Sequence, residues 1–108
     1  MSLLMNYVEI KDGQSKVLHF TDQYMVDREI WDKELGKVRI VRSLVLSTDE
    51  VDGVLDFKSF SVLSTKLYAM LSPYLPDNRY RDFDFRITKT GSGFLTDWQV
   101  EATPRPPA

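Results

Sequence analysis

Residues 83–100 read FDFRITKTGSGFLTDWQV, a stretch with the pattern of two short strands joined by a tight turn. Apolar and polar side chains alternate over residues 83–88 and again over 95–102, as in strands that bury one face. The glycines at 91 and 93 supply the backbone freedom that a two-residue hairpin turn requires. We therefore predict a type II′ turn at Gly91-Ser92 that closes an antiparallel hairpin.

This turn determines which residues of the predicted hairpin lie opposite each other. The expected pairs are Phe85 with Trp98, Phe83 with Val100, Ile87 with Thr96, and Arg86 with Asp97. One face of the hairpin is apolar and aromatic, and its register is strongly specified because a slip of one residue would turn all of these rings to solvent. Arg86 and Asp97 would form an exposed cross-strand ion pair that contributes only about 0.2–1 kcal/mol.

The chain before this hairpin contains further strand signals. A first hairpin is predicted from residues 6–10 and 17–20, with Asp12-Gly13 as its turn. Residues 21–35 are compatible with a strand or a short helix, and a strand is favoured. The β-branched run over residues 38–46 predicts a strand, and residues 47–53 are interpreted as an acidic loop.

A helix is predicted over residues 57–72, before the final hairpin. Apolar side chains recur there at intervals of three and four, which would place them on one helix face: Phe57, Phe60, Leu63, Leu67, Met70, Leu71 and Tyr74. Asp56 is the expected N-cap, and Pro73 and Pro76 are expected to end the helix.

The predicted order is three strands, one helix and a two-strand hairpin, which indicates an α+β fold. This is the element order of the OB-fold, a small antiparallel β-barrel of about five strands with its helix between the third and fourth strands. Other α+β sandwiches share the order. A chain of 108 residues is long enough for one domain, which we place at residues 1–103. Residues 104–108 are expected to form a flexible proline-rich tail.

Composition argues against several classes of chemistry. The chain has no cysteine, so it can form no disulfide, thiolate metal site or cysteine nucleophile. Neither a phosphate-binding glycine loop nor a Gly-x-Ser-x-Gly motif is present, and we expect no enzymatic activity and no cofactor. His19 is interpreted as a surface or hydrogen-bonded residue. No apolar run suits a membrane span or a signal peptide, and we expect a cytoplasmic protein.

The segment FRITKTGSGFLTDWQV, residues 85–100, resembles the closing hairpin of phage-type and related single-stranded-DNA-binding or accessory proteins with OB-like cores. The resemblance implies a small replication or repair accessory protein without enzymatic chemistry. In that pattern the position of Asp97 is often basic and that of Trp98 is often tyrosine. The acidic residue at 97 departs from this pattern, and it argues against a contact between this strand and a phosphate.

Binding of single-stranded nucleic acid needs cations along the phosphates and aromatic rings that stack on bases. The side chains that we expect to serve these roles are Trp31, Lys37, Arg39, Arg42, Tyr80, Arg81 and Lys89. In a regular strand Lys37 and Arg39 share a face and Arg42 points the other way. Trp98 is expected in the core. The net charge of −2 excludes duplex coating by bulk charge but not a local basic groove.

A protein-interaction module is the alternative function. Tyr68 and Leu75 extend the apolar face of the predicted helix, and Pro104-x-x-Pro107 fits a polyproline II ligand. An exposed apolar remainder would form a homodimer or bind a protein partner, as in a phage assembly factor, an adaptor or an inhibitor.

Overall fold

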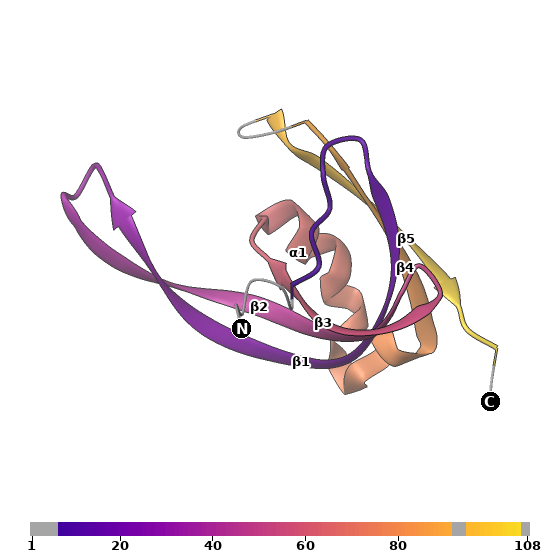
Figure 1. Ribbon diagram of the computed structural model, residues 1–108. Coiled ribbons are helices and arrows are strands. Elements are labelled where there is room, and N and C mark those ends of the chain that lie inside the picture. The colour runs from indigo at the N-terminus through magenta and orange to yellow at the C-terminus, as the bar shows by residue number, and fades with distance from the viewer. Residues whose placement is uncertain (1–6, 92–94, 107–108) are drawn as a thin grey trace.

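The computed structural model describes residues 7–91 and 95–106, which form one five-stranded antiparallel sheet and a short helix (Figure 1). The elements are β1 (Ser15–Asp32), β2 (Lys37–Val51), β3 (Val54–Val62), α1 (Thr65–Leu71), two 3-10 segments (Ser72–Tyr74 and Pro76–Asp82), β4 (Phe83–Thr90) and β5 (Asp97–Pro104). The order across the sheet is β3-β2-β1-β4-β5. Five strands with a helix between the third and fourth are confirmed, but the sheet is open. Within the described ranges, no helix has the length and apolarity to cross a membrane.

β1 and β2 extend far beyond the rest of the sheet. β4 pairs with β1 only over residues 15–18, and β3 pairs with β2 only from Leu44 onward. Residues 26–43 therefore pair only with each other and project as a two-stranded ribbon, which we call the arm (Figure 1). The strand favoured over residues 21–35 is confirmed as far as Asp32, after which residues 33–35 belong to a turn, and the strand over 38–46 is confirmed.

The turn at the tip of the arm is held by Asp32. Its Oδ1 accepts hydrogen bonds from the backbone N–H groups of Glu34 and Leu35, at 3.0 and 3.1 Å. Gly36 closes the turn at a φ of 63°, a value at which a side chain would be strained.

The core is built on three phenylalanines from three strands. The ring of Phe20 lies 6.0 Å from that of Phe60 and 5.4 Å from that of Phe85, measured between centroids. Leu67 and Leu71 of α1 are buried against the same face of the sheet. The register of β1 shifts on either side of Phe20, and this bulge brings Gln23 rather than Asp22 to the helix side.

The prediction of a helix over residues 57–62 and of a loop over 47–53 was wrong. Asp52 and Gly53 both have positive φ, 53° and 79°, which is the geometry of a type I′ hairpin turn. This turn places Val51 opposite Val54 and returns the chain as β3. Residues 47–51 are therefore the end of β2, and residues 57–62 are a strand.

The helix begins after β3. Its N-cap is Ser64, whose hydroxyl accepts from the backbone N–H of Leu67 at 3.3 Å, and not Asp56. The spacing of three between Phe57, Phe60 and Leu63 had indicated one helical face. In the strand, Phe60 is 3% exposed and Phe57 is 72% exposed, and Leu63, just after the strand, is 68% exposed. The predicted end of the helix before Pro73 is confirmed.

The predicted hairpin of residues 6–10 with 17–20 was also wrong. Asn6 lies outside the described residues. Residues 7–10 bury Val8 and Ile10 and form a single parallel bridge, from Tyr7 to Ser59 of β3. A turn does occur at Asp12-Gly13, but Gly13 donates its N–H to the carbonyl oxygen of Lys89. Residues 17–20 pair instead with β2 and β4.

β4 and β5 form the predicted antiparallel hairpin in a different register. Phe85 lies opposite Ala102, Arg86 opposite Glu101, and Lys89 opposite Trp98. The predicted pairs of Phe85 with Trp98 and of Arg86 with Asp97 were therefore wrong. Ser92 of the predicted turn lies outside the described residues. The pairing of Thr90 with Asp97 leaves residues 91–96 as the connection, longer than a two-residue turn.

The chain remains attached to the sheet beyond residue 103. Pro104 is the last residue of β5, opposite Phe83, where an edge strand tolerates a missing N–H. The N–H of Arg105 donates to the carbonyl oxygen of Asp82 at 2.8 Å. We predicted that the flexible tail starts at residue 104. For Pro104 and Arg105 this prediction was wrong.

A pair of substitutions distinguishes the strand from the predicted helix. We expect Phe60→Ala to lower the free energy of unfolding by about 3–5 kcal/mol, because it removes a ring from the core. Phe57→Ala, three residues earlier, should change it by no more than about 0.5 kcal/mol, because that ring is exposed. Urea unfolding followed by circular dichroism measures both values. Equal losses would contradict the observed β3.

Candidate nucleic-acid interface

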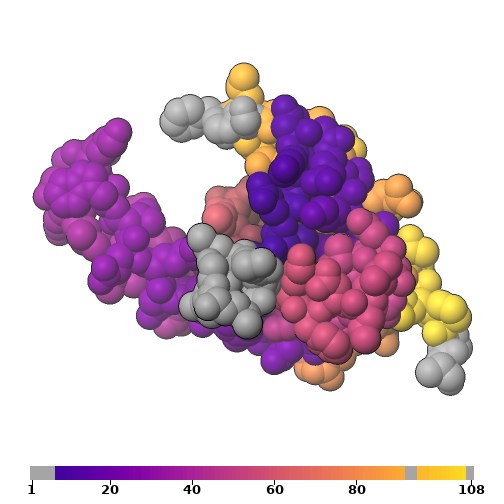
Figure 2. Space-filling view, in the orientation of Figure 1, coloured from indigo at the N-terminus to yellow at the C-terminus, as the bar shows by residue number. Residues whose placement is uncertain are grey.

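The arm curves away from the body and leaves an open hollow, with α1 at its back and the β4–β5 hairpin on the other side (Figure 2). A pocket of 280 Å³ lies at the base of the arm, between the sheet and α1. It is lined by Met25, Val41, Arg42, Ser43, Leu44, Val62, Leu63, Ser64, Thr65 and Tyr68. The base of the hollow is therefore largely apolar, with hydroxyl groups and one guanidinium.

Side chains alternate between the two faces of the arm. Met25 lies opposite Leu44 on the helix side, and the same ribbon face continues through Asp27 opposite Arg42 to Trp31 opposite Val38. Trp31 is 62% exposed. Trp31 and Arg42 therefore extend the face that begins in the pocket.

The other face of the arm carries Lys37 and Arg39, which share a face as the alternation predicts. The Nε of Arg39 lies 3.9 Å from a carboxylate oxygen of Asp32. This long, exposed pair contributes little to stability. The two cations predicted to act together thus lie on the face of the ribbon opposite Arg42.

Lys89 and Trp98 meet at the loop end of the β4–β5 hairpin. They are cross-strand partners, and the ammonium of Lys89 lies 5.7 Å from the centre of the Trp98 ring, within range of a cation–π interaction. Trp98 is half-buried and packs against the core, in agreement with the burial predicted for it.

Asp97, the residue before this tryptophan, forms an ion pair with Lys66 of α1. Its carboxylate also accepts from the backbone N–H of Trp98 at 3.0 Å. The hydrogen bond from Lys66 is the main cause that lowers the pKa of Asp97, and that from the Trp98 N–H adds to it. Both side chains of the pair remain substantially exposed, at 59% and 48%.

Tyr80 and Arg81 lie outside the hollow. The ring of Tyr80 is 1% exposed, and its hydroxyl donates to Asn78 at 2.8 Å. The prediction that Tyr80 stacks on a base was therefore wrong, because its ring is part of the core. Burial raises the pKa of this phenol. Arg81 donates from Nε to the carbonyl oxygen of Thr21 at 2.8 Å and lines a different pocket, together with His19.

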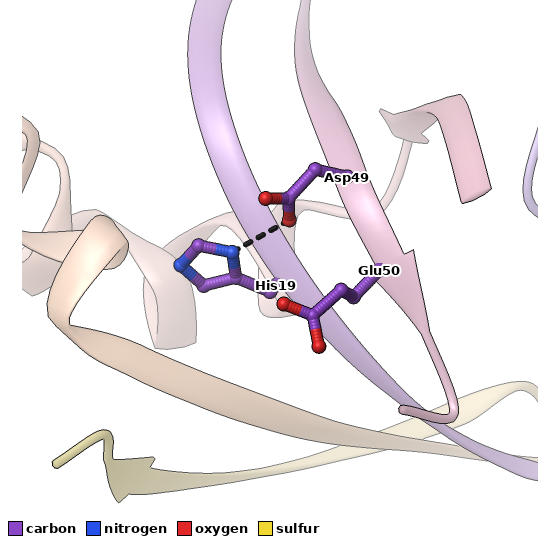
Figure 3. Close-up of side chains that lie close together, drawn as sticks. All are labelled: His19, Asp49 and Glu50. Atoms are coloured by element: carbon purple, nitrogen blue, oxygen red, sulfur yellow. Dashed lines mark hydrogen bonds and ion pairs between the residues drawn. The ribbon is translucent and has the colours of Figure 1, made fainter. Parts of the chain in front are cut away.

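His19 belongs to a polar cluster that the sequence did not indicate (Figure 3). Its Nδ1 lies 2.6 Å from Asp49, and its Nε2 lies 2.8 Å from the carbonyl oxygen of Arg81. Both neighbours are acceptors, so both bonds form when each ring nitrogen carries a hydrogen. Our interpretation of His19 as a hydrogen-bonded residue agrees with this geometry.

Arg105 completes the cluster from the C-terminal segment. Its two terminal nitrogens donate to Glu50 at 2.9 Å and to Asp84 at 3.0 Å. The hydrogen bond to Glu50 raises the pKa of the guanidinium, and the charges of Asp84, Glu50 and Asp49 add to this effect. The pairing holds β2, β4 and the segment after β5 together.

The ligand atoms of His19, Asp49 and Glu50 lie within 4.8 Å of one another, a spacing that a metal ion could use. However, Nδ1 of His19 is already bonded to Asp49, and Glu50 binds the guanidinium of Arg105. A bound cation would have to displace these bonds and would lie beside a fixed positive charge. The cluster is therefore better explained as an ion-pair network than as a metal site.

Comparison with protein-family models, with curated proteins and with solved structures found no match for this chain. The functional interpretation therefore depends on the connectivity of the sheet and on the side chains around the hollow.

The ion pair of Lys66 and Asp97 makes the stability of the fold depend on pH. Because the pKa of Asp97 is lowered in the folded protein, the pair stabilises the fold above the usual value of 3.8. This contribution disappears as the pH falls through the lowered value. A carboxyl carbon NMR titration should show that Lys66→Met moves the pKa of Asp97 back up, and an unchanged titration would contradict the pairing. Arg39→Met, which breaks the pair with Asp32, is the control and should leave Asp97 unaffected.

Proposed function

We propose that this protein binds single-stranded nucleic acid in the hollow, without catalysis, as an OB-like replication or repair accessory protein. The observation that carries the proposal is the strand order β3-β2-β1-β4-β5 with the helix between β3 and β4. This is the connectivity of the OB-fold, a five-stranded barrel that is often partly open. OB-folds bind oligonucleotides on a strand face flanked by the β1–β2 and β4–β5 loops.

The arm is the counterpart of the β1–β2 loop in this comparison. It is a paired ribbon rather than an irregular loop, and it borders the hollow opposite the loop end of β4 and β5 (Figure 1). The two elements that flank the ligand in an OB-fold thus flank the hollow here.

The side chains around the hollow are of the types that hold a single strand. Aromatic rings are available on the arm, on α1 and on β5, in Trp31, Tyr68 and Trp98, of which the first two are 62% and 41% exposed. Stacking of a base on such a ring contributes about 1–3 kcal/mol. The observed register places the half-buried ring of Trp98 beside Lys89 at the loop end instead of opposite Phe85.

Three cations accompany these rings. They are Arg42 on the arm, Lys66 on α1 and Lys89 on β4. Arg42 lines the pocket, Lys89 lies over Trp98, and Lys66 pairs with Asp97, the residue before Trp98. Their small number and the net charge of −2 predict binding through local contacts, with moderate affinity.

Fluorescence anisotropy with labelled oligothymidine at low salt tests the proposal. We expect Trp31→Leu to weaken binding about 5- to 150-fold, the loss of one stacked base. The matched control is Phe57→Leu, because this exposed ring lies on the β2–β3 hairpin and does not line the pocket. Equal effects of both substitutions, or no binding at high micromolar protein, would refute the proposal.

The salt dependence gives a second, independent measurement. If three cations neutralise three phosphates, the logarithm of the association constant should fall against that of salt concentration with a slope of about −2. A flat dependence would show that phosphates are not contacted, even if the oligonucleotide binds.

A protein partner is the second candidate, favoured by the apolar exposure of the arm. Ile30, Leu35, Val38 and Ile40 are between 41% and 65% exposed, and an isolated two-stranded ribbon is marginally stable in water. Light scattering over a concentration series tests for self-association. A strictly monomeric protein that binds oligothymidine would favour the nucleic-acid function.

A further inference from the structure

Two of the three cations around the hollow already have a carboxylate partner from the same chain. Lys66 of α1 is paired with Asp97 of β5, and the Nε of Arg42 lies 3.3 Å from Oδ1 of Asp27 across the arm. The pairs come from opposite sides of the hollow. The groups that would hold phosphates are thus bound to anions that occupy the same positions a phosphate would take.

The pair of Lys66 and Asp97 is the better placed to act as a competitor. Asp97 is the first residue of β5, where the connection from β4 ends, and its carboxylate pairs with Lys66 of α1. It is also oriented by the N–H of Trp98, which gives it a second hydrogen bond. The pair is exposed, so an incoming phosphate could displace the carboxylate without opening the core.

We propose that Asp97 masks Lys66 and thereby sets the affinity of the hollow for the phosphate backbone of single-stranded nucleic acid. This inference rests on the proposed function. In the free protein, Asp97 takes the place of a phosphate on Lys66. In the complex, a phosphate displaces it, and the separated carboxylate then repels the strand. Asp97 is a specificity-determining residue in this scheme, because a ligand must supply enough stacking to offset the lost ion pair.

The first test is the affinity of Asp97→Asn for oligothymidine, measured by anisotropy at low salt. We expect binding roughly fivefold tighter than that of the original protein, the magnitude of an exposed ion pair. Removal of any carboxylate adds one positive charge, so the matched control is Asp32→Asn. Asp32 pairs with Arg39, which lies on the other arm face, and its substitution should change affinity much less.

A double substitution separates masking from a general charge effect. In a Lys66→Met background, Asp97→Asn should give no more gain than Asp32→Asn, because the masked cation is gone. The salt slope of the single variant Asp97→Asn should also be steeper by about 0.7, because binding to it leaves no displaced carboxylate that takes up a cation. Thermal unfolding of each variant verifies that it is folded at the temperature of the measurement.

The outcomes distinguish this inference from the proposed function. If the original protein and both single variants bind equally well, the function stands and the masking by Asp97 is refuted. A gain that persists in the Lys66→Met background also refutes it. If neither the original protein nor any variant binds oligothymidine, both proposals fail. Binding by Asp97→Asn that exceeds that of Asp32→Asn and depends on Lys66 supports masking.

Discussion

The backbone pairing of β1 is the constraint on which the rest of the structure depends. β1 is the central strand of the sheet, it is 18 residues long, and it pairs with β2 along most of that length. Its partner on the other side, β4, is 8 residues long and reaches only residues 15–18. The first part of β1 therefore belongs to a packed sheet, whereas from residue 26 onward no third strand extends the β1–β2 pair. The two residues of β1 in the core, Leu18 and Phe20, lie in the first part, and the register shifts on either side of Phe20.

This difference in length produces both the hollow and its chemistry. A strand pair that leaves the sheet exposes side chains that would otherwise be covered, which explains why Trp31, Val38 and Ile40 are more than half exposed. Ion pairs such as that of Arg42 with Asp27 add little to the stability of such a ribbon. A ligand or partner that covers the apolar side chains of the arm would therefore stabilise it more than these ion pairs do. This holds for either candidate function.

Parts of this structure could be predicted from the sequence because they depend on short-range patterns. Alternation identified β4 and β5, a β-branched run identified the core of β2, and prolines identified the end of α1. The helix over residues 57–62 was wrong because a spacing of three placed Phe57, Phe60 and Leu63 on one helical face, although Asp52-Gly53 is a typical type I′ sequence. The register of β5 was wrong because it depends on a longer connection, and the contacts of Asp97 with Lys66 and of Arg105 with Glu50 join residues distant in the chain.

The pairing of cations within the hollow also explains how an acidic protein could bind a polyanion selectively. A free lysine attracts any phosphate, whereas a lysine held by a carboxylate exchanges one anion for another with little net gain in electrostatic energy. Stacking on Trp31 or Trp98 must then supply most of the affinity, and this favours strands whose bases are unpaired and accessible. In a duplex the bases already stack on one another, so the same exchange brings no compensating contact. Under the proposed function, selection of single strands would follow from the balance between paired cations and the rings of Trp31 and Trp98.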